Sequence, residues 1–333
     1  MSTDLFQTPA WFDNLRATGF VEPPVVHSVA LIAADAIEAD PARLLLMPRD
    51  GGRALGALSN YYSCLYGPVG RPETLDEMNL VRWRDAARAI RGLPGSSVLH
   101  LQPLDAEAPW LGPLEEALQA SGYQTDRYFC FGNWYQPVAA GGFHAYWAAR
   151  PSALRHSVER GRRRLDKTGS WHIEIVQDDA ARVETAISAY EVVYASSWKP
   201  AEPCPAFMPG LIRAAAQQGW LRLGVLWLDG QPVAAQVWLV AAGKANIYKL
   251  AYVRGREKLS AGSVLTTALM QHVLDTDGVH EVDYLSGDDP YKADWMAHRR
   301  ERVGLVAFDL RRWRGVGAAV RHTAGRLLKR LRA

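Results

Sequence analysis

The sequence predicts a mixed α/β fold made of two lobes of similar size, followed by a basic amphipathic helix. Three observations support this prediction. Segments rich in β-branched and aromatic residues alternate with helical segments over residues 1–138. Residues 245–285 contain a strand, a helix and a second strand with short joints, the pattern of a right-handed parallel crossover. Residues 310–333 contain eight Lys or Arg and no Asp or Glu.

The first lobe is expected to span residues 1–138. Its expected helices are 1–20, 73–93 and 114–120, and its expected strands are 25–32, 43–47, 53–58, 97–101 and 128–135. The segment 58–70 is aromatic and rich in turn-forming residues. From there Tyr61 and Tyr62 could line a substrate cleft, or the segment could simply pack over the sheet.

The second lobe is expected to span residues 139–309 and to begin with a helical stretch, 143–167, that carries six arginines. These arginines could form a positive rim that attracts an anionic ligand, or a solvated helix face. The further expected helices are 180–196, 206–218, 263–275 and 290–299, and the expected strands are 171–176, 220–228, 231–241, 245–253, 281–285 and 303–309. Asp229 and Gly230 predict a tight hairpin turn.

Composition narrows the class of protein. Hydrophobic content of 48% and charged content of 22% in 333 residues are typical of a soluble globular protein. No apolar run reaches the ~18 residues of a membrane-spanning helix, and the N-terminus does not resemble a signal peptide. The three cysteines lack CxxC spacing, and His272, His280 and His298 are not spaced as metal ligands. We therefore expect a cytoplasmic protein without a metal.

Four ordered motifs suggest a family. They are Ser-Trp-Lys-Pro at 197–200, Tyr-Lys-Leu-Ala-Tyr at 248–252, Ser-Ala-Gly-Ser-Val-Leu at 260–265 and Gly-Asp-Asp-Pro-Tyr-Lys at 287–292. Together with the element order, they resemble the CelD-type acetyltransferase domain of the GNAT superfamily, which is related to the FemAB-like tandem-lobe transferases. The resemblance covers about residues 140–308 and extends more weakly over 1–138. It implies two GNAT-like lobes in tandem.

The resemblance also implies acyl-CoA as a co-substrate. The strand 248–253 would bind the pantetheine arm through its backbone, and the loop 254–263 would hold the pyrophosphate at the start of the next helix. The loop departs from the superfamily's usual glycine pattern and keeps mainly Gly262. The residues implied for this role are Lys249, Ala251, Tyr252, Arg254, Lys258, Ser260, Gly262 and Ser263.

Acyl transfer to an amine needs a base and a group that stabilises the oxyanion. Asp288, next to Asp289, is the expected base, with a pKa raised by mutual repulsion. Asp289 could instead cap the helix that begins after it, or bind substrate. Lys292 could stabilise the oxyanion or form a surface ion pair, and Tyr291 could protonate the leaving thiolate. Further expected substrate contacts are Trp198 and Lys199, together with the two tyrosines of the first lobe.

The tail, 310–333, places apolar residues on one helical face and basic residues on the other. Such a helix could bind the inner-membrane surface, or pack on the body of the protein. Membrane binding would make a lipid amine an attractive acceptor, as in the bacterial ceramide synthases, which N-acylate a sphingoid base and also resemble GNAT enzymes. Two alternatives remain: a FemAB-like transferase that uses charged tRNA, and a non-catalytic GNAT-like module of envelope or membrane assembly. We expect no nucleic-acid partner.

Overall fold

The computed structural model describes residues 4–31, 42–70 and 80–332, and these form two compact units. Unit 1 comprises residues 1–131 and 301–333, and unit 2 comprises residues 132–300. The strands β5 (Tyr123–Pro137) and β11 (His298–Asp309) carry the chain from one unit to the other. Both ends of the chain therefore belong to unit 1.

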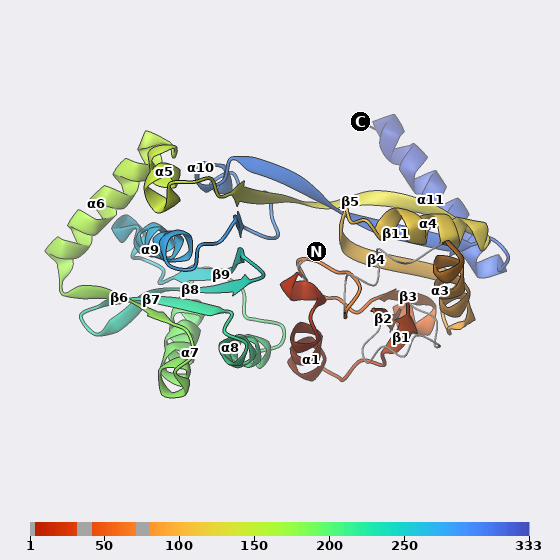
Figure 1. Ribbon diagram of the computed structural model, residues 1–333, viewed down its shortest axis with the longest axis horizontal. Coiled ribbons are helices and arrows are strands. Elements are labelled where there is room, and N and C mark those ends of the chain that lie inside the picture. The colour runs from red at the N-terminus through yellow and green to blue at the C-terminus, as the bar shows by residue number, and fades with distance from the viewer. Residues whose placement is uncertain (1–3, 32–41, 71–79, 333) are drawn as a thin grey trace. The chain divides into compact units, whose positions relative to one another are not determined.

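Unit 1 is a mixed sheet in the order β1-β2-β3-β4-β11-β5 (Figure 1). All these pairs for which a register is defined are antiparallel except β3 with β4. The additional strands are β1 (His27–Ala30), β2 (Arg43–Arg49), β3 (Ala54–Ala57) and β4 (Val98–Asp105), and the helices are α1 (Pro9–Thr18), α3 (Leu80–Gly92), α4 (Leu111–Ala120) and α11 (Trp313–Arg332), with short 3-10 turns η1 (Leu5–Gln7) and η2 (Asp50–Gly52).

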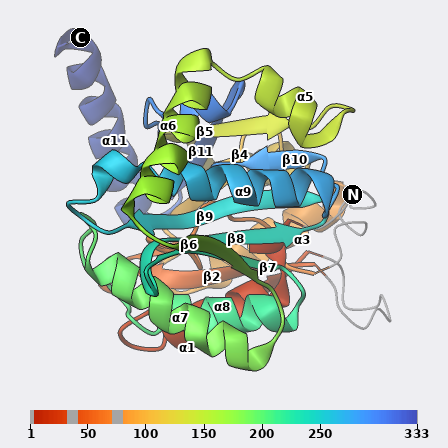
Figure 2. The ribbon, with the colours of Figure 1, turned by 90° about the vertical axis from the view of Figure 1, so that its left-hand side faces the viewer.

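Unit 2 contains the remaining part of the same mixed sheet, in the order β5-β10-β9-β8-β7-β6. Only the pair β9–β10 is parallel. Helices cover both faces of the sheet, with α5, α6 and α9 on one face and α7 and α8 on the other (Figures 1 and 2). The bounds are α5 (Gly142–Ala148), α6 (Ser152–Thr168), β6 (Trp171–Val176), α7 (Ala180–Ala195), α8 (Phe207–Gln217), β7 (Leu221–Leu228), β8 (Gln231–Ala241), β9 (Lys244–Tyr252), η3 (Glu257–Leu259), α9 (Ala261–Asp275), β10 (Glu281–Asp283) and α10 (Lys292–Trp295).

Local sequence explains most of these boundaries. Asp179 caps α7 by accepting a hydrogen bond from the amide of Arg182. Asp229 and Gly230 both have positive φ angles, of 50° and 74°, as a two-residue hairpin turn requires, so the predicted turn is confirmed. The core of unit 2 forms where α9 places Leu265 and Leu269 against the strands that contain Leu226 and Trp238.

The mixed α/β prediction is confirmed, with differences in detail. The helical stretch 143–167 is broken at Pro151, which cannot continue α5, and resumes as α6. The expected helix 290–299 is wrong, because only Lys292–Trp295 is helical and β11 already begins at His298. Parts of three expected elements, 1–3, 32 and 73–79, lie outside the described residues. No helix in the described part of the chain is both long and apolar enough to cross a bilayer.

Candidate active site

The candidate site of unit 2 lies where β9 and β10 separate. The two strands pair at only three positions, residues 244–246 with 281–283. Farther along β9, the register with β8 shifts so that Tyr248 is an extra residue, which is a β-bulge and bends the strand. After β10, Leu285 adopts a positive φ of 55° and turns the chain away from β9. The divergence leaves the edge of β9 beyond Asn246 without a neighbouring strand on that side.

The loop 254–263 leads from this part of β9 into α9. Ser260 has a positive φ of 51° and begins the helix without a side-chain cap. Consequently, within the described chain, the amides of Ala261, Gly262 and Ser263 donate no hydrogen bond. Arg254 and Lys258 are exposed on the same loop. Free amides, the positive end of a helix dipole and nearby cations together favour binding of an anion.

A glycine of α6 allows this helix to lie directly against the loop. A Cβ atom at Gly161 would stand 2.9 Å from the carbonyl oxygen of Leu259 and 3.0 Å from Cβ of Ser260. Three residues along α6, Arg164 donates a hydrogen bond of 2.6 Å to the carbonyl of Lys258. The helix therefore supports the loop and brings the side chain of Arg164 to it.

Replacing Gly161 by Ala tests this support. We expect the variant to lose about 1–3 kcal/mol of unfolding free energy in urea titration, because the added methyl group displaces backbone atoms of the loop. Gly112→Ala is the matched control: it also lies inside a helix, but its Cβ would meet open space. This control should gain about 0.5–1 kcal/mol from helix propensity. An equal gain at both positions would contradict the role assigned to Gly161.

The segment after α7 brings Trp198, Lys199 and Glu202 to β9. The amide of Arg254 donates to the carbonyl of Ser196, which ties this segment to the start of the loop 254–263. The rings of Trp198 and Tyr252 lie 4.4 Å apart. Glu202 Oε1 lies 2.9 Å from Nζ of Lys249, although both oxygens of this carboxylate are buried and accept no well-aligned hydrogen bond. Two aromatic rings, Trp198 and Tyr252, and the ion pair of Glu202 and Lys249 therefore lie at the same part of β9.

Lys199 is the most perturbed cation of this group. Burial, and next the neighbouring positive charge of Lys249, lower the pKa of its amine from the usual 10.5 to about 8. Glu202 and Asp289 act in the opposite direction. Within the described chain its amine has no hydrogen bond or ion pair, and its contact is with the ring of Trp198. An amine with this pKa is partly neutral near physiological pH and can accept a proton.

Lys292 holds the turn that follows β10. Its side chain is buried, and Nζ donates to the carbonyls of Ser286, at 2.6 Å, and Gly287, at 3.1 Å. Asp289 Oδ2 lies 3.6 Å away. The amine thus forms an ion pair with the exposed Asp289, but it is itself buried and also holds two backbone carbonyls of the turn. Asp289 does not cap the following helix through its side chain, as had been one expectation, because α10 starts only at Lys292 and has no side-chain cap.

Asp288 lies in a different environment from the one expected. Its carboxylate accepts hydrogen bonds from both Nε and Nη2 of Arg299, at 3.0 Å and 2.6 Å, and from the indole of Trp134 at 2.8 Å. The hydrogen bonds from Arg299 are the largest cause that lowers the pKa of Asp288. The expectation of a raised pKa is therefore wrong: a cation compensates the neighbouring carboxylate.

Two tyrosines, Tyr284 and Tyr291, flank this turn and contact each other. Burial, and then Asp289, raise the pKa of Tyr291 to about 12. Tyr291 is hydrogen-bonded to Tyr284, a fully buried phenol whose pKa burial raises well above its usual value. Tyr291 remains 44% exposed, so a ligand could reach it.

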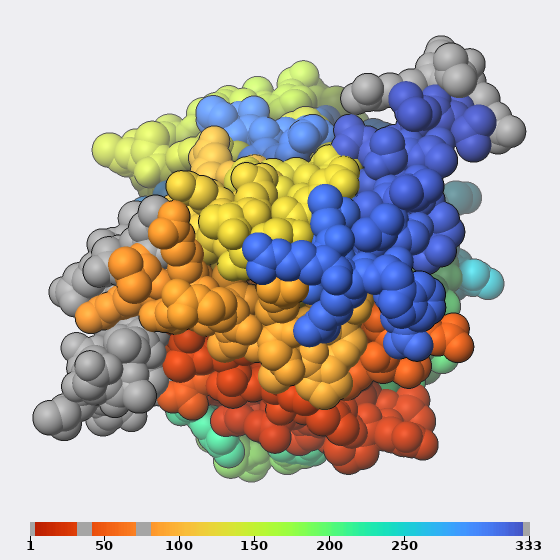
Figure 3. Space-filling model, turned by 90° about the vertical axis from the view of Figure 1, so that its right-hand side faces the viewer, coloured from red at the N-terminus to blue at the C-terminus, as the bar shows by residue number. Residues whose placement is uncertain are grey.

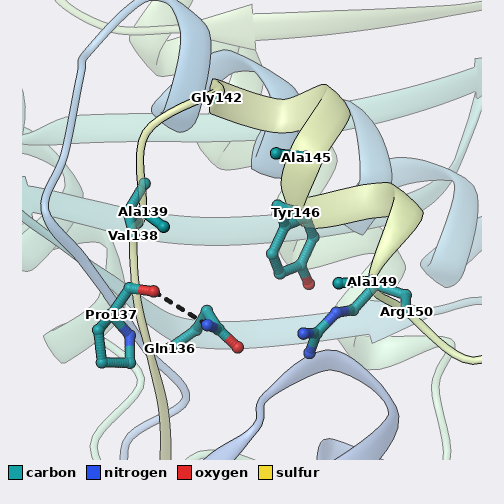
Figure 4. Close-up of a pocket in the computed structure, with 9 residues that line it drawn as sticks. All are labelled: Gln136, Pro137, Val138, Ala139, Gly142, Ala145, Tyr146, Ala149 and Arg150. Carbon is teal, nitrogen blue, oxygen red and sulfur yellow. Dashed lines mark hydrogen bonds between the residues drawn. The ribbon is translucent and has the colours of Figure 1, made fainter.

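The remaining predicted residues divide between the units. Ala251 is buried in β9. Tyr61 and Tyr62 belong to unit 1, where Tyr61 is exposed and Tyr62 is buried with the two rings 5.2 Å apart. No group of His, Cys, Asp and Glu in the described residues could hold a metal ion. A separate pocket of about 130 Å³ beside α5 is small, and its polar groups Tyr146 and Arg150 are already bonded to the carbonyl of Trp295 (Figure 4).

Sequence reasoning missed Glu202 and the partners of Asp288. Glu202 lies between Pro200 and Pro203, three positions after Lys199, and this spacing of an acid and a base was a usable signal. Arg299 and Trp134 carry no motif. They meet Asp288 only because β5 and β11 run past the turn in the folded chain.

Comparison with known proteins shows which domain and which folds the chain resembles. Residues 152–293 match the family model described as an acetyltransferase (GNAT) domain. FemX has a similar structure, with a TM-score of 0.64, 12% identity, and 93% of each chain covered. The C-terminal domain of a putative lysylphosphatidylglycerol synthetase from Agrobacterium fabrum has a TM-score of 0.51 and 15% identity, with 80% of this chain and 84% of that chain covered. A protein of unknown function from Bacteroides thetaiotaomicron also has a TM-score of 0.51, with 9% identity and 81% and 86% covered.

No curated protein sequence matches the chain. Residues 152–293 match a GNAT domain, and the fold of the chain is GNAT- and FemAB-like, as the four motifs predicted. The chain is accordingly a transferase.

Proposed function

We propose that this protein is an N-acyltransferase that moves an acyl group from acyl-CoA to an amine at the site in unit 2. The observation that carries the proposal is the lysine with a pKa of about 8, Lys199, beside the opening of β9 and β10. The GNAT domain supports transfer as the reaction type. The uncapped start of α9 and its basic loop support a phosphorylated donor such as CoA.

In the proposed reaction, Lys199 takes a proton from the acceptor ammonium. The amine nitrogen attacks the thioester carbonyl, the C–N bond forms and the C–S bond breaks. The thiolate leaves and takes the proton of Tyr291 or of water, and the second proton that the acceptor nitrogen loses as the amide forms restores that tyrosine or water. The backbone of β9 between Lys249 and Tyr252 would orient the carbonyl, and the pair of Glu202 and Lys249 would position Lys199. Lys292 and Asp288 act here by fixing the turn after β10, although Asp288 also remains a candidate for the base.

A lysine base predicts a particular dependence of the rate on pH. We expect kcat/KM to rise with pH and to level off above an apparent pKa of about 8, because the neutral form of Lys199 is active and its pKa is lowered to that value. The apparent pKa of this rise in kcat/KM should be the same for two acceptor amines whose ammonium pKa values differ. An apparent pKa that changes with the acceptor would show that the titrating group is the substrate amine and not Lys199.

The acceptor that we favour is an amine carried by a membrane lipid, such as a sphingoid base. The support comes from α11, which packs on unit 1 through small residues such as Ala319 and leaves its larger apolar side chains exposed. Exposed apolar residues of this segment are Leu310, Trp313, Val316, Val320, Leu327 and Leu328. An exposed apolar face flanked by arginines suits the inner-membrane surface, which would place the enzyme peripherally on its cytoplasmic side.

A FemAB-like transferase that uses aminoacyl-tRNA is the second candidate, favoured by the similarity to FemX across both units. Donor binding separates the candidates. We expect acetyl-, medium- or long-chain acyl-CoA to raise the thermal unfolding midpoint, and transfer to survive ribonuclease. No stabilisation by any of them, with ribonuclease-sensitive activity, would favour tRNA; no stabilisation and no activity would favour a non-catalytic module.

A further inference from the structure

Unit 1 contains a cavity of about 620 Å³ that has no part in the proposed transfer reaction. Its volume falls within the range of about 300–1,000 Å³ that is usual for small-molecule sites. The cavity is bordered by the turn between β2 and β3, by β4 and β11, and by the first turns of α11. Figure 3 shows the face of unit 1 along which this C-terminal segment lies. All of the lining residues belong to unit 1.

Three arginines line the cavity without a carboxylate partner. Within the described chain, Arg53, Arg314 and Arg321 form no ion pair within 4.0 Å. The neighbouring arginines behave differently: Arg312 pairs with Asp309 and donates to Ser96, and Arg326 pairs with Asp126. The paired arginines attach the helix to the unit. The three in the cavity leave their charge available to a ligand.

The other lining groups set the charge of the cavity. Asp50 is the carboxylate of the lining, so three arginines and one aspartate give a net charge of +2. The imidazole of His100 adds no full charge, because burial lowers its pKa from 6.5. Phe308 and Val98 form an apolar floor, and Trp313, which is 80% exposed, offers its ring at the side. The cavity therefore combines a twofold positive charge with an apolar surface.

We propose that this cavity binds a phosphomonoester whose remaining part contacts Trp313 and Phe308. A phosphomonoester carries a charge of about −1.5 to −2 at neutral pH and three acceptor oxygens, which match the net +2 and the three guanidinium groups. A carboxylate or a phosphodiester carries a single charge and would leave the cavity unbalanced. Such a group occurs on soluble metabolites and on lipids of the phosphatidic acid type, and the exposed apolar residues of α11 are compatible with both.

Binding by the full chain tests the proposal and distinguishes the two sources. Glycerol 3-phosphate, titrated by calorimetry, probes the soluble source. Vesicles of phosphatidylcholine with phosphatidic acid probe the lipid source, and vesicles with phosphatidylglycerol control for a singly charged diester. We expect Arg53→Gln and Arg314→Gln each to weaken binding of the active probe about tenfold or more, since a charge-assisted contact is lost. Asp50→Asn should strengthen it by removing repulsion, and Asn tolerates the positive φ of 51° at this position.

Arg88→Gln is the matched control, because Arg88 is 69% exposed in unit 1, pairs with Asp85 and does not line the cavity. Binding of glycerol 3-phosphate that depends on the cavity arginines would identify a soluble ligand, and binding only of phosphatidic acid vesicles with this dependence would identify a lipid headgroup. Three results would overturn the proposal: no binding of either probe, equal losses in Arg88→Gln and Arg53→Gln, or equal affinity for phosphatidic acid and phosphatidylglycerol vesicles. Thermal unfolding of each variant confirms that it is folded.

Discussion

Replacing Lys199 by Met is expected to reduce kcat for amine acylation by about 10²–10⁴-fold, the usual contribution of a general base. The methionine side chain retains the length and the apolar contact with Trp198 but cannot accept a proton. The alkaline rise of the rate near pH 8 should disappear together with the activity, because its cause is the lowered pKa of this amine. Steady-state kinetics over pH 6–10 measure both effects (about two units either side of the expected limb).

Two variants separate a base from a simple charge contact. Lys199→Arg keeps the positive charge but cannot lose a proton, so it should be as inactive as Lys199→Met. Lys167→Met removes an exposed lysine at the end of α6 and should leave kinetics unchanged. Wild-type activity in Lys199→Arg would contradict the base assignment. If Asp288→Asn instead abolished both the activity and the pH limb, Asp288 would be the base.

Replacing Asp283 by Ala is expected to cost about 3–5 kcal/mol of unfolding free energy. Asp283 is fully buried at the end of β10 and accepts hydrogen bonds from Asn133 and from the amide of Leu285, each at 2.6 Å. It also pairs with Arg300, whose pKa is raised by Asp283 and Glu281 despite partial burial. Alanine would leave these buried donors without an acceptor. It would also destabilise the turn at Leu285, where the chain leaves β10.

Urea titration measures this loss through the shift of the unfolding midpoint. Glu184→Ala provides the control in the same unit, since Glu184 forms a two-pronged pair with Arg213 but both side chains are about half exposed, at 55% and 49%. We expect this variant to unfold at nearly the wild-type midpoint, because exposed pairs are solvated and screened. Similar midpoints for the two variants would contradict the structural role of the buried aspartate.

The sequence predicted the elements whose signals are local. Asp229-Gly230 identified the hairpin, and the apolar spacing of 263–275 identified α9, because both are short-range properties of the chain. The helix expected over 290–299 failed for the opposite reason. Its residues suit a helix, but pairing with neighbouring strands favours the extended conformation from His298 onward.

The sequence indicated which motifs to group together, but it could not predict the protonation states of their side chains. The motifs around Lys199, Lys249 and Lys292 lie far apart in sequence, and the structure brings these three charges close enough to interact. The pKa values of Lys199 and Asp288 depend on burial and on neighbours such as Arg299 that no local pattern indicates. The base was therefore assigned from sequence to the carboxylate whose pKa the fold lowers.

The most direct test of the central claim is to detect the amide product together with released CoA. The purified full-length protein would be incubated with acetyl-, medium- or long-chain acyl-CoA and with soluble amines, polyamines or long-chain amino alcohols. Thiol release would be followed by absorbance and the product by mass spectrometry. We predict equimolar thiol and amide, formed only when an amine is present and lost in Lys199→Met. Absence of an amide from every pair, with Lys199→Met indistinguishable from the wild type, would contradict acyl transfer from CoA by this site.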